Sequence, residues 1–330
     1  MKCINNLLLL LTCLISLCVL TGCGAEPEYR YEEAKAVAAF SFTDTGEGSA
    51  EGFAENLCVC ASDEGSIAET EEGRDMYASA GLFNITDGQT IYSRDIFKRL
   101  YPASMTKVMT ALLVAESCSN NEISPDSLIT CSENVEIKEK DAQLCGFKAG
   151  DTMTLDEAMH GLLMYSGNDA AVLIAESISG SVEAFAQKMN DKALSLGATG
   201  THFVNPHGLS DEEHYTTPYD MYLIFNEAVK YQWIRDIMNC PEYTYSYTRA
   251  DGSSKELTFN TTNYYLKGDR KVPEGVSVIG GKTGTTLAAG NNLVLLSMRE
   301  DSGKEYISIV MRADTRDDLY KKMTTLLEAE

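Results

Sequence analysis

The chain has 330 residues, of which 44% are hydrophobic and 23% charged, so it is long enough for one large globular domain or two smaller ones. Its formal net charge of −22 argues against nucleic acid as a partner, because phosphate binding needs clustered Lys and Arg. The charge says little about the fold.

The N-terminus predicts export. Lys2 precedes a largely apolar stretch over 7–20, which is too short to span a bilayer comfortably. This stretch ends in Leu20-Thr21-Gly22-Cys23, which resembles the lipobox of bacterial lipoproteins. We therefore expect a signal peptide over 1–22, lipidation at Cys23, an acidic linker over 23–52 and a folded domain over 53–330. The alternatives are an uncleaved membrane anchor or ordinary secretion, with Cys23 incidental.

The cysteines and histidines do not predict a metal site. The pair Cys58-Val59-Cys60 has no matching second pair, and the sequence has no His-Glu-x-x-His. We expect neither a metal nor a cofactor. Six cysteines follow the predicted lipidation site, and their connectivity stays open, with free or structural thiols expected. They are Cys58, Cys60, Cys118, Cys131, Cys145 and Cys240.

The first predicted elements are a hairpin and a helix. Residues 79–84 and 89–93 read as strands joined by a tight turn at Asp87-Gly88. After Pro102 an apolar stripe with helical spacing begins at Met105. Ser104 and Lys107 lie beside this stripe, so we expect them to face a cleft at the edge of the core.

The middle of the chain predicts several helices. Thr154 and Glu157 form a capping box, and the helix that they open breaks at Ser166-Gly167-Asn168. Further helices are expected over 169–178 and 182–196. Thr217-Pro218 marks another helix start, because threonine is a good N-cap and proline suits the first helical position.

The last part of the chain predicts strands and a final helix. Strands are expected over 276–280, leading into Lys282, and over 292–298 and 306–311, with a helix from about Thr315. Strands at both ends around a helical middle predict an α+β fold, with one sheet assembled from distant segments. The helical insertion would lie against this sheet, and a cleft would form between them.

Three short motifs follow one another in the chain: Ser104-x-x-Lys107, Ser166-Gly167-Asn168 and Lys282-Thr283-Gly284. A lysine one helical turn after a serine can accept the proton of its hydroxyl. Taken singly, the first two motifs are weak signals, because Ser and Lys at this spacing are common on solvated helices and Ser-x-Asn recurs elsewhere. Ser-x-x-Lys and Lys-Thr-Gly each occur once.

This ordered set resembles the penicillin-recognising serine acyltransferases, which include β-lactamases and penicillin-binding proteins. The stretches over 101–104, 166–172 and 202–209 are similar to the D-alanyl-D-alanine carboxypeptidases in particular. The resemblance covers about residue 53 to the C-terminus. It implies a β-lactamase/transpeptidase-like fold, with an antiparallel sheet flanked by helices and the active site in the cleft beside a helical insertion.

The resemblance also implies catalytic roles. Ser104 Oγ would attack a peptide-like carbonyl, and a neutral Lys107 would accept its proton. Ser166 would relay a proton to the leaving amine. The backbone N–H groups of Ser104 and Thr285 would form the oxyanion hole.

Other residues would bind substrate, by the same resemblance. Asn168 would hydrogen-bond the substrate backbone, and Lys282 would hold its terminal carboxylate together with the hydroxyls of Thr283 and Thr285. Arg316 is a further candidate ligand of this carboxylate. The alternative is that Arg316 is only a solvated residue in the first turn of the last helix. The two histidines of the stretch over 202–208 are expected to pin a loop through hydrogen bonds rather than bind a metal.

The function implied by the resemblance is a lipid-anchored, monomeric carboxypeptidase that faces the bacterial cell wall. It would remove the terminal D-Ala of peptidoglycan stem pentapeptides through an acyl-Ser104 intermediate, and β-lactam antibiotics would acylate the same serine. Two alternatives remain. One is a serine β-lactamase, although no Glu-x-x-Leu-Asn segment follows Asn168 and Gly167 replaces the aspartate usual in class A enzymes. The other is a non-catalytic wall-binding lipoprotein.

Overall fold

The computed structural model describes residues 57–63, 78–140 and 142–330. The predicted signal peptide, Cys23 and the predicted acidic linker lie outside these residues. Within the described part of the chain, no helix combines the length and the apolar character needed to cross a bilayer.

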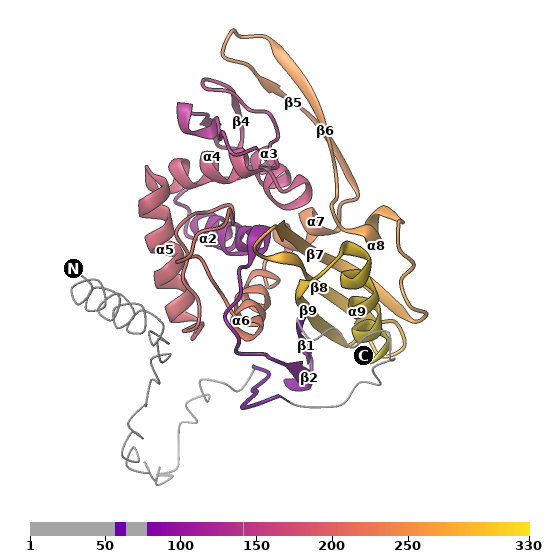
Figure 1. The fold of residues 1–330 in the computed structure, drawn as a ribbon. Helices are drawn as coiled ribbons and strands as arrows, with labels where there is room; N and C mark the ends of the chain where they lie inside the picture. Colours follow the sequence, from indigo (N-terminus) through magenta and orange to yellow (C-terminus); the bar gives the residue numbers. More distant parts are fainter. Residues whose placement is uncertain (1–56, 64–77, 141) are drawn as a thin grey trace, which may run out of the picture. The chain divides into compact units, whose positions relative to one another are not determined.

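A five-stranded antiparallel sheet forms the centre of the domain (Figure 1). Its order is β2-β1-β9-β8-β7, so the N-terminal hairpin pairs directly with the last strand of the chain. The prediction of an α+β fold whose sheet joins both ends of the domain is confirmed. The strands are β1 (Ser79–Asn84), β2 (Gln89–Arg94), β7 (Val276–Thr286), β8 (Gly290–Arg299) and β9 (Glu305–Ala313).

The turn of the N-terminal hairpin is longer than predicted. Four residues, 85–88, separate β1 from β2, where the Asp87-Gly88 pair had predicted a tight turn. Asn84 explains the difference, because its Oδ1 accepts the backbone N–H groups of Thr86 at 3.1 Å and Asp87 at 3.0 Å. The side chain thus replaces the backbone bonds that a shorter turn would make.

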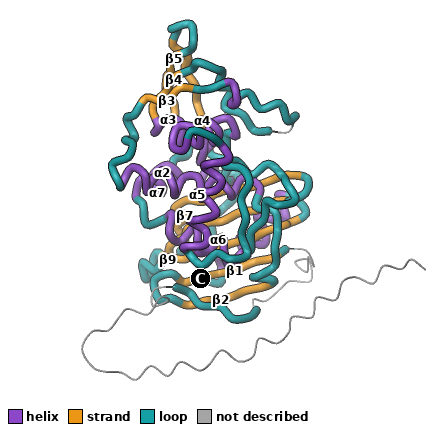
Figure 2. The backbone as a smooth tube through the Cα atoms, turned by 90° about the vertical axis from the view of Figure 1, so that its left-hand side faces the viewer, coloured by secondary structure: helices purple, strands orange, loops and turns teal. Residues whose placement is uncertain are grey.

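Helices cover both faces of this sheet (Figures 1 and 2). On one face α9 packs through Leu319, Met323 and Leu327 against apolar side chains of β8 and β9. The other face contacts α6 and α7, with α2 packed behind α6. The helices are α2 (Lys107–Ser119), α3 (Leu155–His160), α4 (Asn168–Ser179), α5 (Val182–Ser195), α6 (Pro218–Ala228), α7 (Gln232–Asn239), α8 (Tyr264–Lys267) and α9 (Arg316–Glu328). Shorter helical turns are η2 (Ala103–Thr106), η3 (Glu133–Val135) and the π-helical η4 (Gly161–Tyr165).

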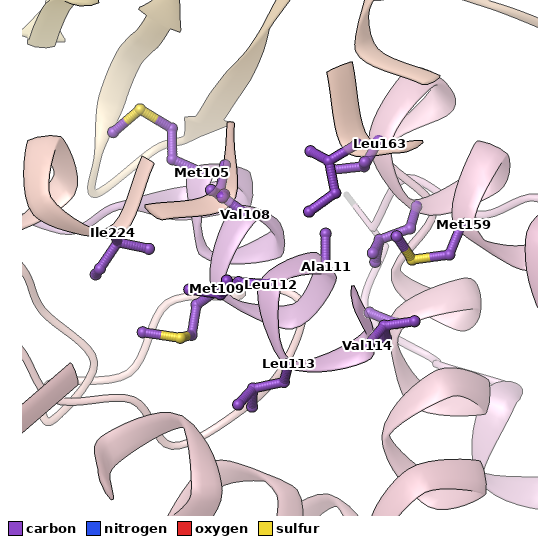
Figure 3. Packing of buried hydrophobic residues seen from close by; sticks show 14 of the residues in the cluster. Met105, Val108, Met109, Ala111, Leu112, Leu113, Val114, Met159, Leu163 and Ile224 are labelled. Carbon is purple, nitrogen blue, oxygen red and sulfur yellow. The ribbon is translucent and has the colours of Figure 1, made fainter. Parts of the chain in front are cut away.

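The central helix α2 is buried on all sides. Ten of its 13 residues are buried, and Figure 3 shows its apolar side chains packed among Met159, Leu163 and Ile224 of the surrounding elements. A helix that is apolar all round belongs in the interior. The predicted position of Lys107 at the edge of the core is therefore wrong, because Lys107 is fully buried.

The helix starts in the middle of the chain follow the predictions. Thr154 and Glu157 form the capping box, with Glu157 N–H donating to Thr154 Oγ1 at 3.2 Å and Thr154 N–H donating to Glu157 Oε2 at 2.7 Å. Thr217 caps α6 by accepting the N–H of Asp220. The predicted bounds of α4 and α5 agree with the structure to within one residue.

A second, four-stranded sheet was not predicted. It has the order β3-β4-β5-β6 and contains the long β5–β6 hairpin that extends from the domain in Figure 1. Tyr245 and Tyr247 of this hairpin are buried, whereas Thr244, Ser246 and Thr248, which alternate with them, are exposed. This alternation of buried and exposed residues is typical of a strand. The buried face of the hairpin packs only against one end of the helical insertion. The strands are β3 (Leu128–Thr130), β4 (Thr152–Thr154), β5 (Glu242–Thr248) and β6 (Ser254–Asn260).

Asn292 joins the large sheet to the segment that enters η2. It is fully buried in β8, and its Nδ2 donates to the carbonyl oxygens of Tyr101 at 3.0 Å and Pro102 at 3.1 Å. Its Oδ1 accepts the N–H of Arg312 at 2.7 Å. An apolar residue would leave all three backbone groups without this partner.

We expect Asn292→Ala to lower the free energy of unfolding by about 1–3 kcal/mol, because buried polar groups lose their hydrogen bonds. Urea unfolding followed by circular dichroism measures the change. Asn134→Ala is the control, since Asn134 is exposed and bonds only at the surface; it should change stability by less than about 0.5 kcal/mol. Equal effects of the two substitutions would contradict this role for Asn292.

Candidate active site

Ser104 lies in a tight turn rather than in the first turn of the α-helix. The turn is η2, and α2 begins only at Lys107. Ala103, directly before the serine, has φ of 49°, a strained left-handed conformation for a residue with a side chain. Such strain is retained where the surrounding structure over-determines it, often at functional sites.

Two glycines allow other segments to approach this turn closely. A Cβ on Gly208 would lie 1.9 Å from the carbonyl oxygen of Ala103. A Cβ on Gly284 would lie 2.6 Å from the carbonyl oxygen of Pro102 and 3.1 Å from Ser104 N. The third residue of Lys282-Thr283-Gly284 is thus glycine because the strand β7 runs directly against the backbone of the serine.

The structure brings Lys107 and Ser104 together as predicted. Lys107 Nζ lies 2.9 Å from Ser104 Oγ. The same nitrogen lies 2.7 Å from Asn168 Oδ1 and 2.7 Å from the carbonyl oxygen of His207. Burial holds the pKa of Lys107 well below its usual range, and the nearby charge of Lys282 lowers this pKa further.

These three contacts define the direction of the hydrogen bond between Ser104 and Lys107. A neutral amine has two N–H donors and one lone pair. The Asn168 amide oxygen and the His207 carbonyl oxygen can only accept, so they take the two N–H groups. The lone pair then faces Ser104 Oγ, whose O–H donates to it. The amine is therefore arranged to remove the hydroxyl proton.

Ser166 and Lys282 form a second pair beside the first. Lys282 Nζ donates to Ser166 Oγ at 2.9 Å and to the Thr283 carbonyl oxygen at 2.9 Å. Burial lowers the pKa of Lys282 to about 7. Ser166 has φ of 69°, and it follows the π-helical turn η4 at the predicted break between helices. This conformation turns its hydroxyl toward Lys282 and into the cleft.

The loop over 202–209 fixes the carbonyl that Lys107 contacts. Asn205 Oδ1 accepts the N–H groups of His207 and Gly208, and His207 Nδ1 accepts the N–H of Leu209 at 3.1 Å. Burial lowers the pKa of His207 to about 3, so its ring is neutral. His202 Nδ1 lies 2.5 Å from the Glu213 carbonyl oxygen. The expectation that these histidines pin a loop through hydrogen bonds is confirmed.

An open cleft of about 1230 Å³ contains the remaining predicted residues. Ser104, Ser166 and Asn168 line it, and so do Thr283 and Thr285 of β7. Arg316, the first residue of α9, also lines it and donates to Tyr264 OH at 3.0 Å. Its acidic neighbours pair with other cations, Asp317 with Arg270 and Lys321, and Asp318 with Lys322. Arg316 thus lies at the cleft, although it is exposed.

Sequence reasoning missed several residues of this cleft. Tyr165, Gln143 and Tyr264 line it, and so does the stretch 260–262 at the end of β6. The sequence carries no motif for them: Gln143 lies in a loop, Tyr165 ends η4, Tyr264 begins α8, and the stretch 260–262 follows the unpredicted hairpin. Asn292 did carry a signal, a polar residue within an apolar strand, which can indicate a buried amide that bonds to backbone.

The cysteines in the described residues are all unpaired thiols, at positions 58, 60, 118, 131, 145 and 240. The same part of the chain has no group of three or more His, Cys, Asp or Glu arranged to hold a metal ion.

Comparison with known proteins gives a family match. The model of the D-alanyl-D-alanine carboxypeptidase family matches residues 69–315. The D-alanyl-D-alanine carboxypeptidase DacF of Bacillus subtilis is 34% identical over 254 residues, covering 76% of this chain and 61% of the relative. DacD of Escherichia coli is 30% identical, covering 71% of this chain and 58% of the relative. The chain thus spans about three fifths of the length of these relatives.

Solved structures agree with the predicted fold. The crystal structure of the Streptomyces K15 DD-transpeptidase matches with a TM-score of 0.70 and 26% identity, covering 77% of this chain and 96% of that chain. The D-alanyl-D-alanine carboxypeptidase DacD from Francisella tularensis matches with a TM-score of 0.68 at 24% identity, which bears on the fold alone. The predicted β-lactamase/transpeptidase-like fold is confirmed.

The two buried lysines, Lys107 and Lys282, should have pKa values far below those of exposed lysines. We expect NMR of ¹³Cε-labelled lysine to show Lys107 as a neutral amine at pH 7 and Lys282 with a midpoint at pH about 7. Burial is the reason, because it disfavours the ammonium form. Lys107→Arg and Lys282→Arg assign the two signals. A Lys107 signal that titrates together with the surface lysines would contradict a neutral amine.

Proposed function

This chain belongs to the D-alanyl-D-alanine carboxypeptidase family, and we propose on that premise that it is a serine-type D-Ala-D-Ala carboxypeptidase. Its substrate is the peptidoglycan stem pentapeptide, from which it removes the terminal D-Ala. The observation that carries the proposal is the buried Lys107 amine, 2.9 Å from the Oγ of Ser104, a residue that lines the cleft. A second buried lysine, Lys282, donates to Ser166 on the same cleft.

Acylation begins when Lys107 Nζ takes the proton of Ser104 Oγ, which attacks the carbonyl carbon of the penultimate D-Ala. The oxyanion of the tetrahedral intermediate accepts from the backbone N–H groups of Ser104 and Thr285. The carbon–nitrogen bond then breaks, and the proton held by Lys107 passes through the hydroxyl of Ser166 to the leaving amine of the terminal D-Ala, which restores the neutral lysine. Water later attacks the ester, which releases the shortened peptide and restores the hydroxyl of Ser104.

Substrate binding uses residues of β7 and of the Ser166 motif. The ammonium of Lys282 and the hydroxyls of Thr283 and Thr285 bind the terminal carboxylate. Asn168 presents its Nδ2 to the substrate backbone, because its Oδ1 is occupied by Lys107. Arg316, held over the ring of Tyr264 at 5.4 Å, adds a second cation to the cleft.

The N-terminal sequence supports an extracytoplasmic location. We infer export by the signal peptide over 1–22 and lipid attachment at Cys23, with the domain over 53–330 facing the cell wall as a monomer. A diacylated cysteine provides two chains, which anchors a protein far better than one. β-Lactam antibiotics are the expected covalent inhibitors, since their ring amide resembles D-Ala-D-Ala.

We expect purified protein to release D-Ala from a D-Ala-D-Ala peptide and to gain one penicilloyl group at Ser104, because both substrates meet the same nucleophile. Amino-acid analysis and mass spectrometry of the intact protein and its peptides measure the two results. Ser104→Ala should show neither. Failure of both reactions in folded protein would sink the proposal, and hydrolysis of penicillin at a high rate would favour the β-lactamase alternative. Full cellular function of Ser104→Ala would favour a non-catalytic wall-binding lipoprotein.

The pH dependence of kcat/KM should be bell-shaped, with its alkaline limb at pH about 7. Lys282 is the cause: its pKa is lowered to about 7, so the ammonium that binds the carboxylate is present below this pH and lost above it. The acid limb reports Lys107, which must be neutral to act. Steady-state assays on a D-Ala-D-Ala peptide measure both limbs. An alkaline limb that persists at the same pH in Lys282→Arg, which stays charged, would contradict this origin.

Arg316→Ala should raise KM for the D-Ala-D-Ala peptide about tenfold with little change in kcat, because it removes an interaction with a carboxylate that does not react. Arg270→Ala is the matched control, since Arg270 pairs with Asp317 outside the cleft. It should leave both constants unchanged. Identical kinetics of the two variants would remove Arg316 from the substrate-binding residues.

A further inference from the structure

Asp169, the residue after Ser166-Gly167-Asn168, is an aspartate whose carboxylate is saturated by backbone groups. It is only 1% exposed. Its Oδ1 accepts the N–H of Cys145 at 2.9 Å and that of Ala170 at 3.0 Å. Its Oδ2 accepts the N–H of Gly146 at 2.8 Å and that of Phe147 at 3.2 Å.

The loop that Asp169 holds adjoins the cleft. We call residues 143–147 the wall loop. Its first residue, Gln143, lines the cleft, and the Gln143 carbonyl oxygen accepts the backbone N–H of Asn168 at 2.8 Å. At its centre Cys145 packs so tightly on the motif that a Cβ on Gly167 would lie 2.2 Å from the Cys145 sulfur. An aspartate at 167 has no room here.

Only an ionised carboxylate suits this position. A carboxylate offers about four lone-pair sites and no donor, which matches four N–H groups. An amide would direct its own NH₂ at these donors and leave some of them unpaired. Buried N–H groups without a partner cost about 1–3 kcal/mol each, so the loop would move rather than stay in register.

Asp169 also adds a charge beside the catalytic amine. Its negative charge raises the pKa of Lys107, in opposition to burial and to the charge of Lys282, both of which lower it. The other titratable groups that act on Lys107, on Asp169 or on both are Cys145, Cys131, Tyr165, Tyr245, His207 and His214. Among these groups Asp169 is the one carboxylate.

We propose that Asp169 is a positioning residue for acylation of Ser104. It fixes the wall loop against Asn168, and Asn168 in turn holds Lys107 Nζ at the serine hydroxyl. The chain of contacts runs from the carboxylate through the wall loop to the Asn168 backbone, and from Asn168 Oδ1 to the amine. This inference rests on the proposed function, because its readout is the acylation of Ser104.

The experiment measures the second-order rate constant of acylation by a fluorescent penicillin between pH 4 and 9. Asp169→Asn should lower this constant by about 10- to 100-fold, as small displacements of catalytic groups do. It should also move the acid limb to lower pH, since loss of the negative charge lowers the pKa of Lys107. Asp169→Glu keeps the charge but moves the carboxylate, so it should slow acylation and leave the acid limb in place.

Asp151→Asn is the matched control. Asp151 is also buried, and its carboxylate accepts the backbone N–H groups of Lys148 at 3.0 Å and Ala250 at 3.2 Å, away from the cleft. The Asp151→Asn variant should unfold at a lower temperature, yet its acylation rate and the acid limb of its pH profile should equal those of the unchanged protein. An acylation rate of Asp169→Asn equal to that of this control, with no shift of the acid limb, would reduce Asp169 to a stability role and overturn the proposal.

Three other outcomes are also decisive. Acylation of Asp169→Glu at the rate of the unchanged protein would overturn the proposal even if Asp169→Asn does not fold. Failure of both Asp169 variants to fold, with Asp151→Asn folded, would make Asp169 a folding residue only. An unchanged protein that penicillin does not acylate would refute the proposed function itself, which separates that failure from failure of this inference.

Discussion

The Lys107 amine connects three segments of the chain that are far apart in sequence. Its nitrogen contacts the serine of η2, the amide of Asn168 at the start of α4 and the carbonyl of His207 in the loop before α6. A charged ammonium in this interior would be costly, so burial keeps the amine neutral. Because a neutral amine has one lone pair and two donors, each of the three segments has to sit in one orientation. The geometry of the site follows from this constraint.

The second lysine extends the same constraint to the sheet. Lys282 on β7 bonds Ser166, and its charge helps to keep Lys107 neutral. The strand can lie this close to the serine because Gly284 has no side chain and because Asn292 ties the entry of η2 to β8. The two lysines are therefore held by regular structure, Lys107 by the buried helix α2 and Lys282 by the strand β7. Such preorganisation is the main source of electrostatic stabilisation in enzymes.

The success of sequence reasoning differed between elements for physical reasons. β1, β8, β9 and α4 carry strong periodicity or end signals, and their bounds follow from the sequence to within two residues. The cap at Thr217 likewise gives the start of α6. The β5–β6 hairpin was missed because its two strands bury only one narrow face. α2 was predicted as a helix with an apolar stripe on one side, whereas the structure buries it on all sides. The lysine in its first turn is a charged residue type, so the sequence did not indicate burial of that side.

The sequence by itself determined the motif residues, the α+β class and the family, because these depend on residue identity, order and local periodicity. It could not determine that Lys107 is fully buried, or that Ser104 lies in a turn that follows a strained residue. Nor could it determine that Asp169 closes the wall loop onto the Ser166 motif. Those properties depend on contacts between segments that lie far apart in the sequence, such as Lys107 with His207 and Asn292 with Pro102. Only the tertiary structure sets the desolvation and the hydrogen-bond directions that turn these residues into a reactive arrangement.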